Sequence, residues 1–416
     1  MRNDISKNKI HNILSYLYSF RMLTYKQILD FLFVSEGLTE SYCDKVIKSL
    51  TNDGYIEKTG TRKVNFRYFV TKKSIKFLRE NGIIAMTNIR QIVKDDVLPC
   101  HKIKMKEQNL NHQEMLNSFV LNFMEMSKGM NDINFSYYDE LYLSSVFPNI
   151  RPDGILIVNN TYYLLELDMN TERKASLKSK WEHYRNFLNS SSYFNTPLNI
   201  KCLFILENVN EKSLRKQNLQ SYISEYLGDK INSKFDIIID TPLNLLGYIK
   251  KDVQNNDTLL LDNMKKFGFK VSGKNFTNDM FGGLSFDRYA HKIDSNGKIL
   301  NENGIDMEYI LDDFYYESMY VISKIEKLPM LSILFKQKTK RELKYIILVK
   351  SAEDIYRTLY RKDTNLLFDN LYFTTRERMI ENHNLDKALF QIDSLNQIYH
   401  YENSVKVIEG TIYNNF

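Results

Sequence analysis

The chain has 416 residues, well beyond the ~100–150 of a usual domain, and its 43% hydrophobic and 26% charged residues exclude wholesale disorder, so we expect about three folded domains. The net charge of +6 is mild, but residues 1–80 contain 15 Lys and Arg against 8 Asp and Glu, which places the positive excess in the first eighty residues. Three distant cysteines without a CxxC pair argue against a disulfide framework or a zinc cluster, and no apolar run reaches the ~18 residues of a membrane span, so we expect a cytoplasmic protein without membrane contact.

The first eighty residues predict three short helices followed by a β-hairpin. Apolar residues recur at helical spacing over residues 5–20, Thr24 and Gln27 have the form of a capping box before a second helix, and Thr39 can cap a third. Residues 55–58 and 66–70 are typical of short strands around a polar tip. This order predicts a winged helix over residues 1–80, a fold that usually places its third helix in the DNA major groove.

Polar and basic side chains of this head are the candidates for contact with double-stranded DNA. They are Ser41, Tyr42, Lys45 and Lys48 on the third helix and Lys58, Arg62 and Lys63 on the hairpin. The alternative is that these lysines form a solvated face and the fold mediates protein contacts. The local excess of positive charge favours DNA.

Residues 81–104 show no clear period and contain Pro99, so we interpret them as a connector, with a first domain boundary near residue 95. An amphipathic helix is expected from about 105 to 127, with His112 on its apolar stripe, and a strand-like stretch follows over residues 134–144.

An acid-bearing hairpin is the most informative segment of the chain. Residues 155–158 and 162–167 are short apolar runs joined by Asn159 and Asn160, a two-residue turn. Asp153 opens the first strand, while Glu166 and Asp168 alternate with leucines in the second. We therefore expect the three carboxylates to converge at one end of the hairpin.

Carboxylate oxygens at that density suit Mg²⁺ or Mn²⁺, which can activate a water molecule and neutralise charge on a phosphodiester. The acids would thus be metal ligands and catalytic groups. The alternative is an exposed hairpin that carries three surface acids.

An α/β module is predicted to follow the hairpin. Thr171 can cap a helix over residues 172–190, on which Lys180 and Tyr184 share a face. A strand over 200–206, a helix over 211–227 and a strand over 235–240 complete an α/β core with a mixed sheet. We assign residues 105–250 to this core as the catalytic domain.

Together these motifs resemble the replication-relaxation proteins of Gram-positive plasmids and mobile elements, which are similar to the MOB-C class of conjugative relaxases. The likeness covers roughly residues 5–250 and implies a restriction-endonuclease-like, PD-(D/E)xK catalytic domain behind a winged-helix head. It is carried by the head and, in order, by His112, Asn117, Glu140, Asp153, Glu166, Asp168, Thr171, Glu172, Lys180 and Tyr184. The position where PD-(D/E)xK expects a lysine holds Asp168, and Lys180 of the next helix can supply the charge instead.

Other candidate residues have a competing structural interpretation. His112 and Glu140 read more readily as core residues, and Glu172 can simply favour a helix N-terminus. Tyr184 is a candidate nucleophile, but in a chain with 28 tyrosines packing is the stronger explanation. The seven histidines form no histidine-hydrophobic-histidine metal triad.

The last third, residues 251–416, is assigned to a C-terminal α/β domain of unassigned role. Residues 251–310 are polar and glycine-rich and are interpreted as a second boundary region. Residues 331–336, 345–350 and 371–375 are expected as strands and 352–361 as a helix, and residues 345–360 loosely echo residues 202–217. This domain is therefore a candidate degenerate copy of the core, without a metal site.

Two main functions follow. The first is a metal-dependent nicking relaxase that binds a plasmid origin through the winged helix and works with other relaxosome or replication proteins. The second is a non-catalytic accessory protein of plasmid replication or of the relaxosome. A double-strand endonuclease of a defence system is a third alternative. The sequence indicates neither the oligomeric state nor the DNA site.

Overall fold

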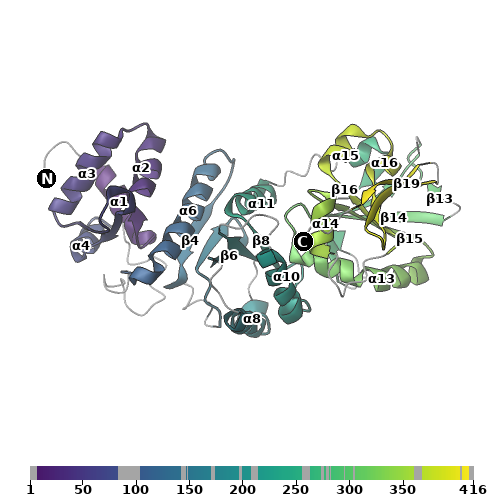
Figure 1. Ribbon diagram of the computed structural model, residues 1–416, viewed down its shortest axis with the longest axis horizontal. Coiled ribbons are helices and arrows are strands. Elements are labelled where there is room, and N and C mark those ends of the chain that lie inside the picture. The colour runs from purple at the N-terminus through teal and green to yellow at the C-terminus, as the bar shows by residue number, and fades with distance from the viewer. Residues whose placement is uncertain are drawn as a thin grey trace. The chain divides into compact units, whose positions relative to one another are not determined.

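The computed structural model describes residues 7–82, 104–141, 147, 149–169, 174–195, 199–207, 214–254, 263–272, 276–277, 281, 283–294, 296–302, 305–359, 368–402 and 405–411 (Figure 1). The chain is mixed α/β, as predicted, and divides into two compact units. One comprises residues 1–169 and 189–195, and the other comprises residues 170–188 and 196–416. Most of the predicted connector lies outside the described residues, as do Thr171 and Glu172.

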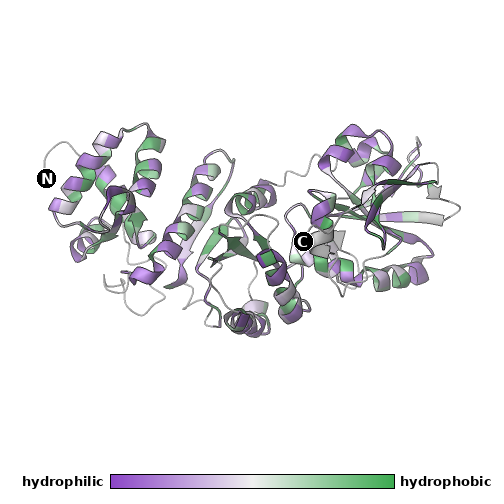
Figure 2. Ribbon diagram, in the orientation of Figure 1, coloured by the Kyte–Doolittle hydropathy of each residue, from purple (hydrophilic) through white to green (hydrophobic). Residues whose placement is uncertain are grey.

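The head of the first unit contains the predicted helices and strands and, in addition, a short strand, two 3-10 helices and the helix α4. Its elements are α1 (Lys7–Ser19), β1 (Leu23–Thr24), α2 (Tyr25–Leu32), η1 (Val34–Glu36), α3 (Glu40–Asn52), β2 (Ile56–Thr59), η2 (Lys63–Asn65), β3 (Arg67–Val70) and α4 (Lys72–Glu80). The strands form a sheet in the order β1-β3-β2. Apolar stripes of α1 and α3 are buried, as their spacing predicts, and Figure 2 shows the alternating hydrophobic and hydrophilic sides of these helices.

Two local signals in the head are confirmed. The Thr24 hydroxyl accepts a hydrogen bond from the Gln27 amide (3.1 Å), and the Gln27 side chain accepts one from the Thr24 amide (2.9 Å), which completes the capping box. At the hairpin tip, Gly60 has φ +100°, and a Cβ there would lie 2.4 Å from the Asn65 carbonyl oxygen, so only glycine fits this turn.

The rest of the first unit is a helix followed by an antiparallel meander. It contains η4 (Glu107–Asn109), α6 (Leu110–Ser127), β4 (Phe135–Asp139), β5 (Gly154–Val158), β6 (Thr161–Asp168) and the short helix α9 (Ser191–Phe194). β4 pairs with β5 and β5 pairs with β6, both antiparallel. Asn159 has φ +50° between Val158 and Thr161, which face each other, so the two-residue hairpin is confirmed.

The second unit begins with the predicted alternation of helices and strands. Its first elements are α8 (Lys174–Leu188), β7 (Asn199–Leu206), α10 (Leu214–Leu227), β8 (Phe235–Asp240) and α11 (Pro242–Gln254). β7 and β8 pair in parallel. Asp236 of β8 accepts hydrogen bonds from the Ser318 hydroxyl (2.6 Å) and the Tyr320 amide (2.9 Å), which fixes the start of a long helix of the C-terminal region against this strand.

A mixed sheet in the order β16-β15-β14-β12-β9 organises the C-terminal region, with β13 paired to β14. The elements are β9 (Phe269–Val271), β10 (Phe276–Thr277), β11 (Ser285–Phe286), β12 (Arg288–Lys292), β13 (Asn301–Glu302), β14 (Ile305–Asp313), α13 (Met319–Thr339), β15 (Glu342–Leu348), α14 (Ala352–Leu359), β16 (Leu371–Thr374), α15 (Arg376–Glu381), α16 (Leu385–Ala388), β17 (Gln391–Ile392), β18 (Gln397–Glu402) and β19 (Val405–Thr411). β17, β18 and β19 form a separate antiparallel sheet.

Two expectations for this region are corrected. The strand expected over Leu331–Lys336 is wrong, because these residues lie inside α13, where Leu328, Leu331 and Phe335 are buried at helical spacing. Residues 251–310 are more than a boundary, because they supply β9 and β12, two strands of the sheet.

Two further findings concern the described residues. Cys43 and Cys202 are free thiols, both buried. None of the described helices has the length and apolar character needed to cross a membrane.

Candidate functional site

Asp153 and Glu166 are the residues just beyond the last β5–β6 pair, Gly154 with Leu165, at one end of the acid-bearing hairpin. The Asp153 amide donates to the Leu165 carbonyl (2.9 Å), the residue that Gly154 already faces, so the regular β5–β6 pairing ends at Gly154. The Asp153 carboxylate then turns back, and its Oδ2 accepts the Leu167 amide (2.8 Å). The position of Asp153 relative to β6 is therefore set by two backbone groups, and the acids do lie at one end of the hairpin.

The three predicted acids differ in burial. Glu166 and Asp168 are 1% and 0% exposed, whereas 22% of the Asp153 side chain is exposed. His112 of α6 places its Nε2 3.1 Å from Asp153 Oδ1. The expectation that His112 is a core residue is thus wrong, because its side chain is 30% exposed and faces a carboxylate. The hairpin and α6 together form an acid–imidazole pair open to solvent.

Glu140 was also expected in the core, and the structure corrects this. Its side chain is exposed and forms an ion pair with Arg21 of the head (2.7 Å). The buried acid is its neighbour Asp139, 2% exposed, which ends β4 opposite Gly154. Asp139 is a candidate that sequence reasoning missed. Its signal is indirect, because only the register of β4 against β5 brings it beside the residue that follows Asp153.

The described residues do not by themselves form the metal site that the sequence predicts, so that site stays a prediction. Among the residues that the structure describes, no three His, Cys, Asp or Glu side chains lie close enough together to hold a metal ion. The physical reason is the orientation of Asp153, whose two oxygens are directed at the Leu167 amide and at His112. We therefore derive no catalytic step through Mg²⁺ or Mn²⁺.

Lys180 and Tyr184 lie on α8, in the second unit. Lys180 is partly buried, with its Nζ 5.4 Å from the centre of the Phe204 ring. Tyr184 is 1% exposed, packs 5.6 Å from the Trp181 ring and accepts a weak hydrogen bond from the Cys202 thiol (3.8 Å). These contacts favour the packing interpretation of Tyr184, since a nucleophile must reach a substrate.

The predicted DNA-contacting face of α3 is available to solvent. Ser41, Lys45 and Lys48 are exposed, and Tyr42 is half-buried. On the hairpin, Arg62 is exposed and Lys58 lies with its Nζ 4.0 Å from the centre of the Phe66 ring.

Lys63 has a different environment from the other predicted DNA contacts. Its Nζ lies 3.0 Å from Glu40 Oε1 and 2.9 Å from Asp44 Oδ2, both on α3. Hydrogen bonding to Lys63 lowers the pKa of Asp44. Lys63 thus neutralises acids on α3 and leaves Lys45 and Lys48 as that helix's exposed cations.

Sequence reasoning missed the basic face of α4. Lys72, Lys76 and Arg79 are exposed and spaced at i, i+4 and i+7, so they line one side of the helix. Lys73 donates to the Asp53 carbonyl (2.6 Å), the residue that caps the C-terminus of α3. The start of α4 is therefore anchored beside the end of α3. The signal was present in the run KKSIKFLRE, where three of the four cations, Lys72, Lys76 and Arg79, fall on one helical face.

Buried hydrogen bonds tie the head to α6. Asn117, fully buried, donates to the carbonyls of Phe20 (3.2 Å) and Met22 (2.7 Å). The Gln27 side-chain amide donates to the Glu114 carbonyl (2.7 Å). Since His112 sits on the same helix, α6 carries contacts to the head and to Asp153.

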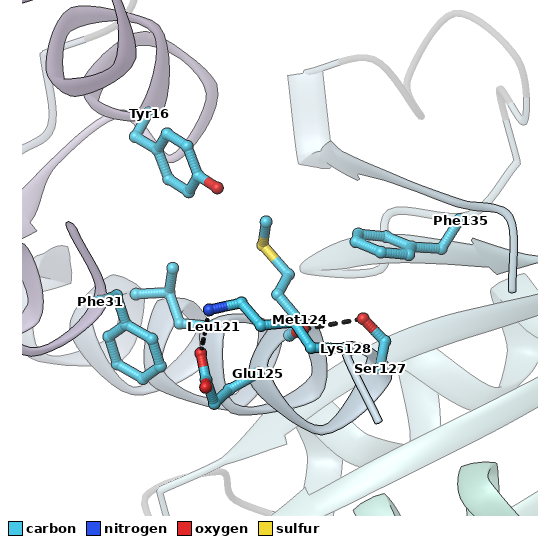
Figure 3. Close-up of a pocket in the computed structure, with 8 residues that line it drawn as sticks. All are labelled: Tyr16, Phe31, Leu121, Met124, Glu125, Ser127, Lys128 and Phe135. Carbon is cyan, nitrogen blue, oxygen red and sulfur yellow. Dashed lines mark hydrogen bonds and ion pairs between the residues drawn. The ribbon is translucent and has the colours of Figure 1, made fainter. Parts of the chain in front are cut away.

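A small cavity lies between the head and α6, but it is not the site. Its volume is about 180 Å³. As Figure 3 shows, it is surrounded by Tyr16, Phe31, Leu121, Met124, Glu125, Ser127, Lys128 and Phe135. Its only charged side chains, Glu125 and Lys128, pair with each other (2.6 Å). The cavity is therefore lined mainly by apolar side chains, and it has no set of polar groups directed at one point where a ligand could bind.

The order of these elements and residues can now be compared with known proteins. Residues 14–200 match the replication-relaxation family. This match supports the resemblance drawn from the motifs, and it suggests a role in plasmid replication or relaxation with a DNA or replication-related partner. No curated protein and no solved structure matches the chain.

The replication-relaxation match spans most of the head, all of α6, and the meander with its acids. It also includes α8 with Lys180 and Tyr184, and it ends as β7 begins. The sheet of the C-terminal region lies beyond the match.

Proposed function

We propose that the protein binds plasmid or mobile-element DNA through residues 1–80, which act as a winged helix, and takes part in replication or relaxation of that DNA. The observation that carries the proposal is the exposed cationic surface of α3 and α4 on a family-matched head. Lys45 and Lys48 are placed to meet DNA from α3, and Lys72 and Lys76 to meet phosphates from α4.

Charge reversal on α3 tests this proposal. The double variant Lys45→Glu, Lys48→Glu is compared with Lys327→Glu, Lys338→Glu, which makes the same charge change at exposed positions of α13. Fluorescence anisotropy with a 30-base-pair duplex across a salt series measures affinity. The head variant should lose roughly tenfold or more in affinity and show a shallower salt dependence, while the control changes little. Equal losses in both variants would contradict a specific role for α3.

Strand nicking is a second candidate activity. In its favour, the solvent-open Asp153–His112 pair lies at the end of the hairpin whose β6 carries the buried Glu166 and Asp168. We propose these groups, in a restriction-endonuclease-like core related to MOB-C relaxases, as the site of cleavage. Glu172 lies outside the described residues, and Lys180 is the candidate for phosphate binding.

Supercoiled plasmid that carries the cognate origin tests cleavage. The wild type and Asp153→Ala are each incubated with Mg²⁺, with Mn²⁺ and with chelator. Metal-dependent open circles that are absent in the variant support a nicking relaxase. Linear product supports a double-strand endonuclease. DNA binding without cleavage by the wild type leaves the accessory protein of replication or the relaxosome as its role. A denaturing gel for protein-linked DNA tests Tyr184 as a nucleophile.

A further inference from the structure

The C-terminal region repeats the order of elements found between β4 and β8. The first series is an antiparallel meander (β4, β5, β6), then α8, β7, α10 and β8, with β7 and β8 parallel. The second is an antiparallel meander (β9, β12, β14), then α13, β15, α14 and β16, with β15 and β16 parallel. Apart from the short elements α9, β10, β11 and β13, seven elements therefore recur in one order, with matching strand directions inside each meander and each parallel pair.

The register of the two meanders makes the repeat specific. In the first, the last pair is Gly154 with Leu165, and the next residues on the two strands are Asp153 and Glu166. In the second, the last pair is Arg288 with Leu311, and the next residues are Asp287 and Asp312. An acid pair thus occupies the same place at the end of the central hairpin in both series.

A backbone hydrogen bond recurs with the acid pair. Asp153 Oδ2 accepts the amide of Leu167, the residue after Glu166 (2.8 Å). Asp287 Oδ2 accepts the amide of Asp313, the residue after Asp312 (2.9 Å). The same side-chain-to-backbone contact therefore stands at the same place in both series.

The second acid pair has a cation of its own. Lys324 of α13, 3% exposed at its side chain, places its Nζ 2.5 Å from Asp312 Oδ2 and 3.0 Å from the Ser285 carbonyl oxygen. The same ammonium lies 4.5 Å and 5.0 Å from the ring centres of Tyr320 and Phe286. A carboxylate, a carbonyl and two aromatic faces therefore surround it.

The remaining bonds of Asp312 are satisfied as well. The Asp287 amide donates to Asp312 Oδ1 (2.9 Å), and the Tyr345 hydroxyl donates to Oδ2. Burial raises the pKa of Asp312 to about 6, against the lowering effect of Lys324. An unneutralised carboxylate in this place would be costly.

We propose that residues 269–374 are a second copy of the core formed by residues 135–240, and that Lys324 serves there as a built-in cation in place of an external metal ion. The ammonium occupies an oxygen-lined position, with carboxylate and carbonyl ligands of the kind that Mg²⁺ and Mn²⁺ prefer. In the second copy, the buried Lys324 ammonium occupies the place beside Asp312. This inference does not depend on the proposed DNA-binding function.

Removal of the lysine tests the proposal on the full chain. Lys324→Ala leaves Asp312 and the Ser285 carbonyl facing a space that Mn²⁺ can enter. We expect Mn²⁺ to raise the thermal unfolding midpoint of Lys324→Ala by several degrees more than it raises the midpoint of the wild type. The control is Lys327→Ala, which alters an exposed lysine of the same helix and should respond to Mn²⁺ as the wild type does. Adding Asp312→Asn to Lys324→Ala should abolish the gain. A gain equal to that of the wild type in folded Lys324→Ala would overturn the proposal.

A second variant keeps the test decisive if Lys324→Ala does not fold. Lys324→Met with Asp312→Asn removes both charges, and replacing both members of a buried ion pair is far less costly than removing one. Circular dichroism should then show recovery of the fold. A double variant as unfolded as the single one would show that charge balance is not the role of Lys324. DNA affinity, measured on the same proteins, separates this outcome from failure of the head's function.

Discussion

The ends of the β5–β6 and β12–β14 hairpins have the same backbone arrangement. They differ in the side chain that faces the acids. Both have an acid on each strand just beyond the last paired residues, and in both the first carboxylate accepts the backbone amide of the residue after the second acid. In the first, Asp153 meets a partly exposed imidazole; in the second, Asp312 meets a buried ammonium. The backbone therefore fixes where the carboxylates lie, while the partner side chain decides whether the place is open to solvent.

The largest expected contrast comes from the lysine that follows each acid-bearing strand. Lys324→Ala leaves a buried carboxylate without its cation and should lower the free energy of unfolding by about 3–5 kcal/mol. Lys180→Ala removes a partly buried side chain over an aromatic ring, and its cost should stay near 1 kcal/mol. Urea unfolding followed by circular dichroism measures both. Equal losses of unfolding free energy in the two variants would mean that Lys180 and Lys324 have the same structural role, which would contradict the contrast between the two hairpins.

A pH series tests the same contrast between the two hairpins, and the expected change in stability is smaller. The pKa of Asp312 is raised in the folded chain to about 6, above its unfolded value, so the stability linked to this group is present at low pH and is lost as pH rises through about 6. The Asp312→Asn variant has no titrating carboxyl at this position, so its stability does not fall in this way as the pH rises. The variant should therefore gain on the wild type between pH 4 and pH 7, by at most about 3 kcal/mol. Asp153→Asn serves as the matched variant of the first hairpin. A difference between wild type and Asp312→Asn that is flat with pH would contradict the burial of this carboxylate in its charged form.

The strands and the head could be predicted because their signals are local. Thr24 and Gln27 form a capping box over three residues, and Asn159 supplies the left-handed turn that its position requires. The strand assigned to Leu331–Lys336 failed because a short apolar run looks alike in a strand and on a buried helix, and only the longer period of α13 distinguishes them.

The sites were harder to predict because they depend on register and on contacts far apart in the chain. Glu140 carries the charge that motif reading selects, yet pairing with β5 buries Asp139 instead. The second acid pair escaped notice because Asp287 and Asp312 are 25 residues apart, against 13 for Asp153 and Glu166. The connection between β12 and β14 is longer because it contains β13. The two acids are therefore brought to the same end of the hairpin only by the pairing of β12 with β14.

The smallest effect is expected at His112. His112→Ala removes a partly exposed histidine–carboxylate contact, and water can take the place of the imidazole beside Asp153, so the free energy of unfolding should fall by less than about 1 kcal/mol. Lys128→Ala, which breaks an exposed pair on the same helix, is the control. Because Asn117 and Gln27 hold the head to α6 through other contacts, DNA affinity should be unchanged. If His112→Ala instead lowers the free energy of unfolding as much as Lys324→Ala does, the first hairpin end is as buried as the second. The distinction between an open and a closed copy would then be wrong.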